Sequence, residues 1–137
     1  MRRQPGLCLS GRVIRAGQAT GIALVSLQPI GFLGGVDPLT GCVIEPGHPL
    51  EGESISGRVL VFPGGKGSTV GSYTLLRLAH SGSAPSAMLC AQSEAIVAVG
   101  AILADIPMVD GLEIARIVTG DRVTVDGPRV EVERVRG

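Results

Sequence analysis

The residues best suited to chemistry lie in one glycine-rich stretch, residues 64–73, with the sequence GGKGSTVGSY. It follows an apolar run that ends at Phe62 and Pro63, and it precedes residues with helical spacing. Open α/β sheets bind ligands at such turns between a buried strand and a helix. Unpaired N–H groups of the first helical turn favour an anion there, and glycines let a ligand come close to the backbone. Residues 64–73 are therefore our candidate loop.

Two side chains of the candidate loop could carry chemistry. Lys66 is the only lysine among 12 basic residues, and Ser68 is the predicted N-cap of the following helix. The loop is not a Walker A motif, because Gly67 rather than Ser or Thr follows Lys66. A serine hydroxyl acts as a base only where preorganised donors stabilise its alkoxide, and a helix N-terminus beside an ammonium group is such a setting. A tight turn with an ordinary serine cap explains the same residues equally well, so both interpretations stay open.

The other polar residues form no recognisable catalytic group. His48 and His80 each stand alone, without a nearby Cys, Asp or Ser in a triad, which predicts loop-packing or surface roles. Asp37 precedes Pro38 and is expected to form an Asx turn rather than to act as a base. No pair of carboxylates has the spacing of a general acid and base.

The cysteines predict neither disulfides nor a metal site. Cys8, Cys42 and Cys90 are odd in number, widely separated and set among apolar neighbours. They are expected to be reduced packing residues without metal-ligand spacing. No apolar signal region follows Arg2 and Arg3, which predicts a cytoplasmic protein.

Length and composition exclude several classes of protein. One domain usually spans about 100–200 residues, so a chain of 137 residues predicts a single domain over residues 1–137. An apolar content of 45% excludes disorder. Twelve basic and twelve acidic residues cancel without a basic cluster, which disfavours nucleic acid and anionic membranes as partners. The longest uncharged apolar run, residues 95–104, is too short to span a membrane and predicts a core helix.

The spacing of apolar residues predicts a mixed α/β fold. Short apolar runs bounded by glycine or proline predict strands, whereas three- and four-residue steps predict helices. A parallel strand–helix core is expected between β segments from both ends of the chain. The predicted strands are residues 7–13, 21–27, 58–62, 85–91 and 106–109, the predicted helices are residues 68–80 and 93–104, and a hairpin turns at residues 126–127.

The first predicted helix has an apolar face. Arg77 and His80 are expected to face away from the core. The stripe expected to face the core consists of Val70, Tyr73, Leu76 and Ala79, widened by Leu75 and Leu78.

A long segment, residues 29–52, separates the second and third predicted strands. Ten of its 24 residues are glycine or proline. Loops longer than about 12–15 residues inside compact domains are usually functional or disordered, and the apolar residues of this segment argue against disorder. A functional loop and an ordered Ω-like loop packed only for structure both fit the sequence.

Five motifs stand in a distinctive order along the chain. They are GFLGGVDPLTG at 31–41, GHPLEG at 47–52, the candidate loop at 64–73, EAI at 94–96 and IP at 106–107. Together they resemble the small subunit of the aconitase X family, over about residues 11–132. Because several separate motifs occur in one order, the resemblance is far more specific than a single glycine-rich loop.

This resemblance implies a fold and a partner. The fold is the swivelling β/β/α domain of aconitases, an α/β fold. The partner is a large subunit that forms a heterodimer with this chain and carries an iron–sulfur cluster of the [4Fe-4S] type, with no cofactor on this chain. Aconitases present a serine base from a Gly-x-Gly-Ser turn, which residues 65–68 match. Aconitase has an arginine after that turn, whereas Thr69 follows Ser68 here, so its way of anchoring the substrate does not carry over.

The resemblance also implies an activity. The chain is most similar to archaeal members that dehydrate (R)-5-phosphomevalonate to trans-anhydromevalonate 5-phosphate in a modified mevalonate pathway of isoprenoid biosynthesis. Ser68 matches the proton acceptor, and the partner's cluster would bind the leaving hydroxyl as a Lewis acid. Alternatives are the dehydration of cis-3-hydroxy-L-proline, a non-catalytic anion-binding module and a purely structural subunit. The expected substrate-binding residues are Gly65, Lys66, Gly67 and Thr69, with Gly34 and Gly35 lining a cleft toward the partner.

Overall fold

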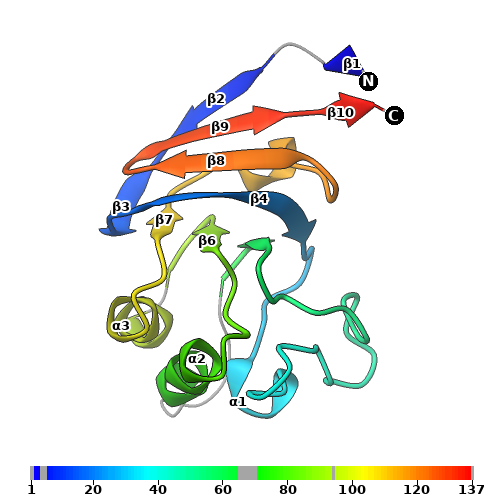
Figure 1. Ribbon diagram of the computed structural model, residues 1–137, viewed down its shortest axis with the longest axis vertical. Coiled ribbons are helices and arrows are strands. Elements are labelled where there is room, and N and C mark those ends of the chain that lie inside the picture. Colours follow the sequence, from blue (N-terminus) through cyan, green and yellow to red (C-terminus); the bar gives the residue numbers. More distant parts are fainter. Residues whose placement is uncertain (1, 4–5, 65–70, 94, 137) are drawn as a thin grey trace.

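The structure is a computed structural model that describes residues 2–3, 6–64, 71–93 and 95–136 (Figure 1). Its strands are β1 (Arg2–Arg3), β2 (Leu7–Ser10), β3 (Arg12–Arg15), β4 (Gln18–Val25), β5 (Val59–Phe62), β6 (Ala87–Cys90), β7 (Met108–Asp110), β8 (Arg122–Asp126), β9 (Arg129–Glu133) and β10 (Val135–Arg136). Its helices are α1 (Phe32–Gly35), α2 (Gly71–His80), α3 (Ala95–Leu103) and the short 3-10 helix η1 (Ile114–Arg116).

Eight of these strands form one sheet in the order β2-β9-β8-β4-β5-β6-β7-β3, and β1 pairs separately with β10. Strands β4 to β7 run parallel to one another, and the strands on both flanks are antiparallel. This arrangement confirms the expected parallel core between β segments from both ends of the chain. The carboxyl ends of β4, β5, β6 and β7 consequently meet at one edge of the sheet, which we call the carboxyl edge.

The two outermost strands of the sheet, β2 and β3, are consecutive in the sequence and are joined by Gly11. The sheet therefore curls until its two outermost strands meet at this residue. The single strand predicted over residues 7–13 is consequently divided into β2 and β3 at Gly11. A Cβ atom at Gly11 would clash with the carbonyl oxygen of Asp110. Glycine is needed here because the chain passes directly over the end of β7.

The molecule has the layers of a β/β/α fold. Figure 1 shows the helices α1, α2 and α3 on one side of β5, β6 and β7, and the antiparallel strands β2, β8 and β9 on the other. Each layer boundary holds its own apolar core. In β5, Leu60 and Phe62 point to the helices, whereas Val59 and Val61 point to the antiparallel strands. The strand predicted over residues 58–62 is thus present as β5, and it is buried on both faces.

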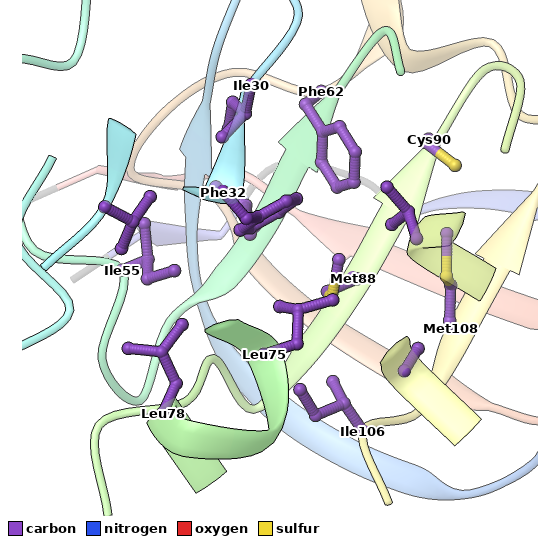
Figure 2. Close-up of a cluster of buried hydrophobic side chains, with 14 of the residues drawn as sticks. Ile30, Phe32, Ile55, Phe62, Leu75, Leu78, Met88, Cys90, Ile106 and Met108 are labelled. Atoms are coloured by element: carbon purple, nitrogen blue, oxygen red, sulfur yellow. The ribbon is translucent and has the colours of Figure 1, made fainter. Parts of the chain in front are cut away.

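The long segment 29–52 is ordered and contributes to the helix-side core. Phe32 of α1 packs edge-on against Phe62 of β5, with ring centroids 6.1 Å apart and an interplanar angle of 79° (Figure 2). Antiparallel bridges join Val36 to Val43 and Cys42 to Ser54. The buried apolar residues of the segment are Ile30, Phe32, Val36, Val43 and Leu50.

The faces of the two long helices differ from the prediction. In α2, Leu75 and Leu78 are fully buried, as predicted, whereas Tyr73 is 62% exposed, so its predicted place on the core face is wrong. Leu76 and Ala79 are half-buried, and Val70 lies outside the described residues. The buried face also includes the small polar residues Ser72 and Thr74, which a count of apolar residues misses.

Helix α3 is not the fully buried core helix that its apolar sequence predicts. Its inner face is buried at Val97 and Ala101. Its outer face exposes Val99, Ile102 and Leu103 by about half of their surface each. No helix among the described residues is long and apolar enough to cross a membrane.

Candidate functional site

The candidate loop belongs to the carboxyl edge of the sheet. The chain enters it from the end of β5 through Pro63 and Gly64, and leaves it at Gly71, where α2 begins. The predicted site residues Gly65, Lys66, Gly67, Ser68 and Thr69 lie outside the described residues. The described flanks therefore define where the loop starts and ends.

The entry to the loop is held by backbone hydrogen bonds to two neighbouring segments. The Ile30 N–H donates to the Gly64 carbonyl at 3.2 Å, and the Gln92 N–H donates to the Pro63 carbonyl at 3.2 Å. A Cβ at Gly64 would lie 3.0 Å from the carbonyl oxygen of Gln92. The absence of a side chain at position 64 thus lets the turn after β6 pack directly on the entry.

The exit from the loop is held by helix packing. Helices α2 and α3 meet at Gly100, where a Cβ would lie 2.6 Å from Leu75 Cδ1 and 3.0 Å from the Cα atom of Ser72. Ser72 and Thr74 are buried against their neighbours, and Tyr73 projects to solvent in the same turn. The first turn of α2 is therefore held by packing, and Tyr73, the last residue of the candidate loop, is an exposed aromatic side chain.

A charged group that we did not single out from the sequence lies at the same edge. Asp110, the last residue of β7, is only 3% exposed. Its carboxylate accepts hydrogen bonds from Arg12 Nε at 3.0 Å and Nη2 at 2.7 Å, and from Ser93 Oγ at 2.6 Å and the Ser93 N–H at 3.3 Å. We call these three residues the Asp110 clamp. The signal that could have revealed it is an aspartate directly after a buried strand at the carboxyl edge.

The clamp determines the charge states in this region. The hydrogen bonds from Arg12, and then those from Ser93, lower the pKa of Asp110 to about 2 although burial acts in the opposite direction. Burial, reinforced by the negative charge of Asp110, raises the pKa of the Cys90 thiol to about 12. At neutral pH, Asp110 is therefore an anion and Cys90 a neutral thiol.

The described cysteines do not fit an iron–sulfur cluster, which is held by several thiolates at one place. Cys8 is exposed, Cys42 is half-buried and Cys90 is a buried neutral thiol, and all three are free. In the ranges that the structure covers, no group of three His, Cys, Asp or Glu residues could hold a metal ion. The expectation that all three cysteines are packing residues is wrong for Cys8, because side chains alternate along β2, and Leu9 points into the core while Cys8 points to solvent.

The histidines and Asp37 lie where the sequence predicts, with His48 packed in the long segment, His80 at the surface and Asp37 in an Asx turn. His48 is 5% exposed, and its Nδ1 accepts the Leu50 N–H at 3.1 Å, while its Nε2 lies 3.1 Å from the Pro29 carbonyl oxygen. A neutral ring protonated at Nε2 satisfies both contacts. Asp37 Oδ1 accepts the Leu39 N–H at 2.9 Å in an Asx turn, and His80 is exposed at the end of α2.

Gly34 and Gly35 lie apart from the candidate loop in the sequence, at the end of α1. Gly34 has a φ of +80° and is exposed, with open space where a Cβ would lie. Gly35 is buried, its carbonyl accepts the Ile44 N–H at 2.9 Å, and a Cβ there would lie 3.5 Å from Glu45 Oε1. The two glycines thus shape a turn of the long segment.

A hollow of about 260 Å³ lies beside the entry to the loop. It is mostly apolar, and its walls come from the end of β4, from Pro63 and from η1. Leu27, which lines it, is 84% exposed. The carboxyl edge therefore combines the flanks of the glycine-rich loop, a buried carboxylate and an apolar hollow.

Comparison with known proteins identifies the family to which the chain belongs. The sequence model of the aconitase X swivel domain matches residues 8–134. The chain belongs to the aconitase X swivel family. The crystal structure of aconitase X from Thermococcus kodakaraensis in its holo-form has a TM-score of 0.91 and 48% sequence identity, covering 92% of this chain and 98% of that chain. This confirms the swivelling β/β/α fold that the resemblance implied.

Relatives within the family share one name. The phosphomevalonate dehydratase small subunit of Methanocella arvoryzae is 58% identical over 122 residues, covering 87% of this chain and 92% of the relative. The phosphomevalonate dehydratase small subunit of Pyrococcus furiosus is 52% identical over 125 residues, covering 91% of this chain and 93% of the relative. The similarity therefore extends over nearly the full length of both proteins.

Proposed function

We propose that the chain is the small subunit of a phosphomevalonate dehydratase, a hydro-lyase that converts (R)-5-phosphomevalonate to trans-anhydromevalonate 5-phosphate in a modified mevalonate pathway. The observation that carries this proposal is the shared name of relatives that are 47–58% identical to the chain. The fold supports it, because the glycine-rich loop stands at the carboxyl edge, where open α/β sheets bind ligands.

The name "small subunit" supports a large subunit as the partner, and we propose a heterodimer in the cytoplasm that is active only when both subunits are present. The cysteines described above do not fit a cluster, so we place the iron–sulfur cluster, of the [4Fe-4S] type, on the large subunit. Such a cluster supplies a Lewis acid for a leaving hydroxyl when it is bound. What this chain adds is the proton acceptor and part of the binding surface.

Ser68 is the proposed base. It would accept the proton from the carbon next to the substrate carboxylate, while the C–H electron pair forms the double bond and the hydroxyl leaves the adjacent carbon. The support from the structure is positional: the loop that contains Ser68 is anchored at Pro63 and Gly64 on one side, and opens into the ten-residue helix α2 on the other. A helix N-terminus stabilises negative charge on an alkoxide.

Substrate binding is assigned to the same loop. We propose that Gly65, Gly67 and Thr69 present backbone N–H groups to the substrate, and that Lys66 attracts one of its anionic groups. The phosphate is remote from the reacting carbon, so its binding energy can be used to orient the substrate. Gly34 and Gly35 remain proposed as part of the cleft toward the partner.

Reconstitution from separate subunits tests the proposal. This chain and the large subunit are purified apart, treated anaerobically with iron and sulfide, and assayed for dehydration of (R)-5-phosphomevalonate alone and mixed. We expect activity only in the mixture, and a colourless isolated chain without stoichiometric iron. Iron bound by this chain alone would contradict the assignment of the cluster, and an inactive mixture that contains a loaded cluster would contradict the function.

A further inference from the structure

The Asp110 clamp joins three segments that are far apart in the sequence. Asp110 ends β7, Arg12 lies in β3 and Ser93 follows β6. Both carboxylate oxygens are used: Oδ1 accepts from Arg12, and Oδ2 accepts from Arg12 and from Ser93. With four donors, the carboxylate holds the turn formed by residues 91–93 against the end of the sheet.

Backbone hydrogen bonds also join this turn to the residues that follow Asp110. The Gly111 N–H donates to the Ala91 carbonyl at 3.0 Å, and the Leu112 N–H donates to the Cys90 carbonyl at 3.3 Å. The residues after Asp110 therefore hold the start of the turn, and the Asp110 side chain holds its end. The turn cannot shift independently of β7.

The turn at residues 91–93 directly contacts the entry to the candidate loop. Between Ala91 and Ser93, Gln92 donates its N–H to the Pro63 carbonyl, and its own carbonyl oxygen is the atom that a Cβ at Gly64 would approach to 3.0 Å. A chain of direct contacts thus leads from Asp110 through Ser93 and Gln92 to Pro63 and Gly64. Ser68 follows Gly64 by four residues.

Stability alone does not explain a buried carboxylate at this place. The Arg12 side chain is 72% exposed and the Asp110 side chain only 5%, so the cost of desolvating Asp110 offsets part of the attraction between the two charges. The advantage of such an ion pair is a defined geometry, since each carboxylate oxygen accepts hydrogen bonds only from particular directions. A site for proton transfer requires such definition, because a displacement of about 1 Å can lower the rate about a hundredfold.

We propose that Asp110 is a positioning residue that holds the entry of the candidate loop, through Ser93 and Gln92, in the geometry that proton transfer requires. The proposal rests on the proposed function for its kinetic consequence. Asp110 touches neither substrate nor cofactor in this account. Its effect is therefore expected in kcat rather than in substrate affinity.

The chain offers a matched control in Asp121. This aspartate is also 3% exposed, and it accepts hydrogen bonds from Arg134 Nε at 3.2 Å and Nη2 at 3.3 Å and from the Val118 N–H at 2.9 Å. It thus resembles Asp110 in burial, charge and type of donors. Its contacts lead to the turn before β8 and not to residues 91–93.

The test compares Asp110→Asn with Asp121→Asn in the assembled two-subunit enzyme. For Asp110→Asn, we expect a kcat at least about tenfold lower, with a KM for (R)-5-phosphomevalonate within about threefold of the wild type. For Asp121→Asn, we expect a kcat within about twofold of the wild type. A kcat of Asp110→Asn within twofold of the wild type, or an equal loss of kcat in both variants, would overturn the proposal.

A second measurement is independent of turnover. Amide hydrogen exchange at Gln92, followed by NMR in the full-length chain, is expected to be faster in Asp110→Asn and unchanged in Asp121→Asn. Unchanged exchange at Gln92 in Asp110→Asn overturns the clamp even if the wild-type complex does not act on phosphomevalonate. If Asp110→Asn fails to fold, Ser93→Ala replaces it, because it removes only the 2.6 Å hydrogen bond, and the same criteria apply.

Discussion

At the scale of single residues, the two roles proposed for Ser68, helix cap and catalytic base, predict effects of different size. As the N-cap of a helix, a serine contributes about 1 kcal/mol to stability. As a catalytic base, it would contribute several kcal/mol to lowering the reaction barrier. The difference in size between these two effects allows one substitution to distinguish the structural from the catalytic interpretation.

We predict that Ser68→Ala lowers the turnover of the assembled enzyme by at least about a thousandfold, while the free energy of unfolding falls by only about 1 kcal/mol. Steady-state kinetics and urea denaturation of the same preparation measure both quantities. A turnover within tenfold of the wild type would end the catalytic interpretation and leave Ser68 as a cap.

Asp110 gives a prediction about acid stability. Its pKa in the folded chain is about 2, below the ordinary value of 3.8, because Arg12 and Ser93 stabilise the anion. A depressed pKa contributes stability that is fully present above the unfolded value and is lost as the pH falls from about 4 to about 2. We therefore expect the wild type to lose on the order of 1–2 kcal/mol more than Asp110→Asn over this range. Urea denaturation at pH 5 and pH 2 measures it, and an equal loss in both proteins would show that the clamp does not stabilise the charge.

At the scale of elements, periodicity identified the strands better than the helix faces. Uninterrupted apolar runs predicted β5 and β6, since strands buried on both faces tolerate only such residues. In α2 the burial of Leu75 and Leu78 was predicted correctly, but Tyr73 was not, because Gly100 lets α3 approach Ser72 closely and Tyr73 points to solvent. In α3 nearly every residue is apolar, and such a sequence does not indicate which side faces the core.

Only the part of the candidate site that is continuous in the sequence could be predicted. The glycine-rich loop is continuous in the sequence, so composition and the strand–helix transition were enough to find it. The Asp110 clamp combines residues whose sequence separations are 17 and 98, and only the register of β3, β6 and β7 brings them together. Sequence patterns that repeat locally carry no information about such a contact.

The long segment 29–52 gives a prediction at this scale. Phe32 anchors it by its contact with Phe62, so Phe32→Ala is expected to lower the free energy of unfolding by about 3–5 kcal/mol. The matched control is Leu39→Ala in the same segment, because Leu39 is 67% exposed and its loss should change stability by no more than about 0.5 kcal/mol. Chemical denaturation compares the two, and similar small effects would mean that the segment is not held by the core.

At the scale of the whole molecule, the curled sheet brings three features of the candidate site to one edge. The carboxyl ends of β4 to β7 carry the apolar hollow at Leu27, the loop after Gly64 and the Asp110 clamp. In the proposed heterodimer, the large subunit with its iron–sulfur cluster faces this edge. We infer that the chain provides a preorganised half-site, and that its selectivity shows only in the complex.

The most direct test of the central claim is the substrate preference of the assembled, cluster-loaded enzyme under anaerobic conditions. Dehydration of (R)-5-phosphomevalonate and of cis-3-hydroxy-L-proline is measured side by side as kcat/KM. We predict that phosphomevalonate is strongly preferred, because its remote phosphate supplies binding energy that orients the reacting carbon toward Ser68. Faster dehydration of cis-3-hydroxy-L-proline would contradict the proposed function.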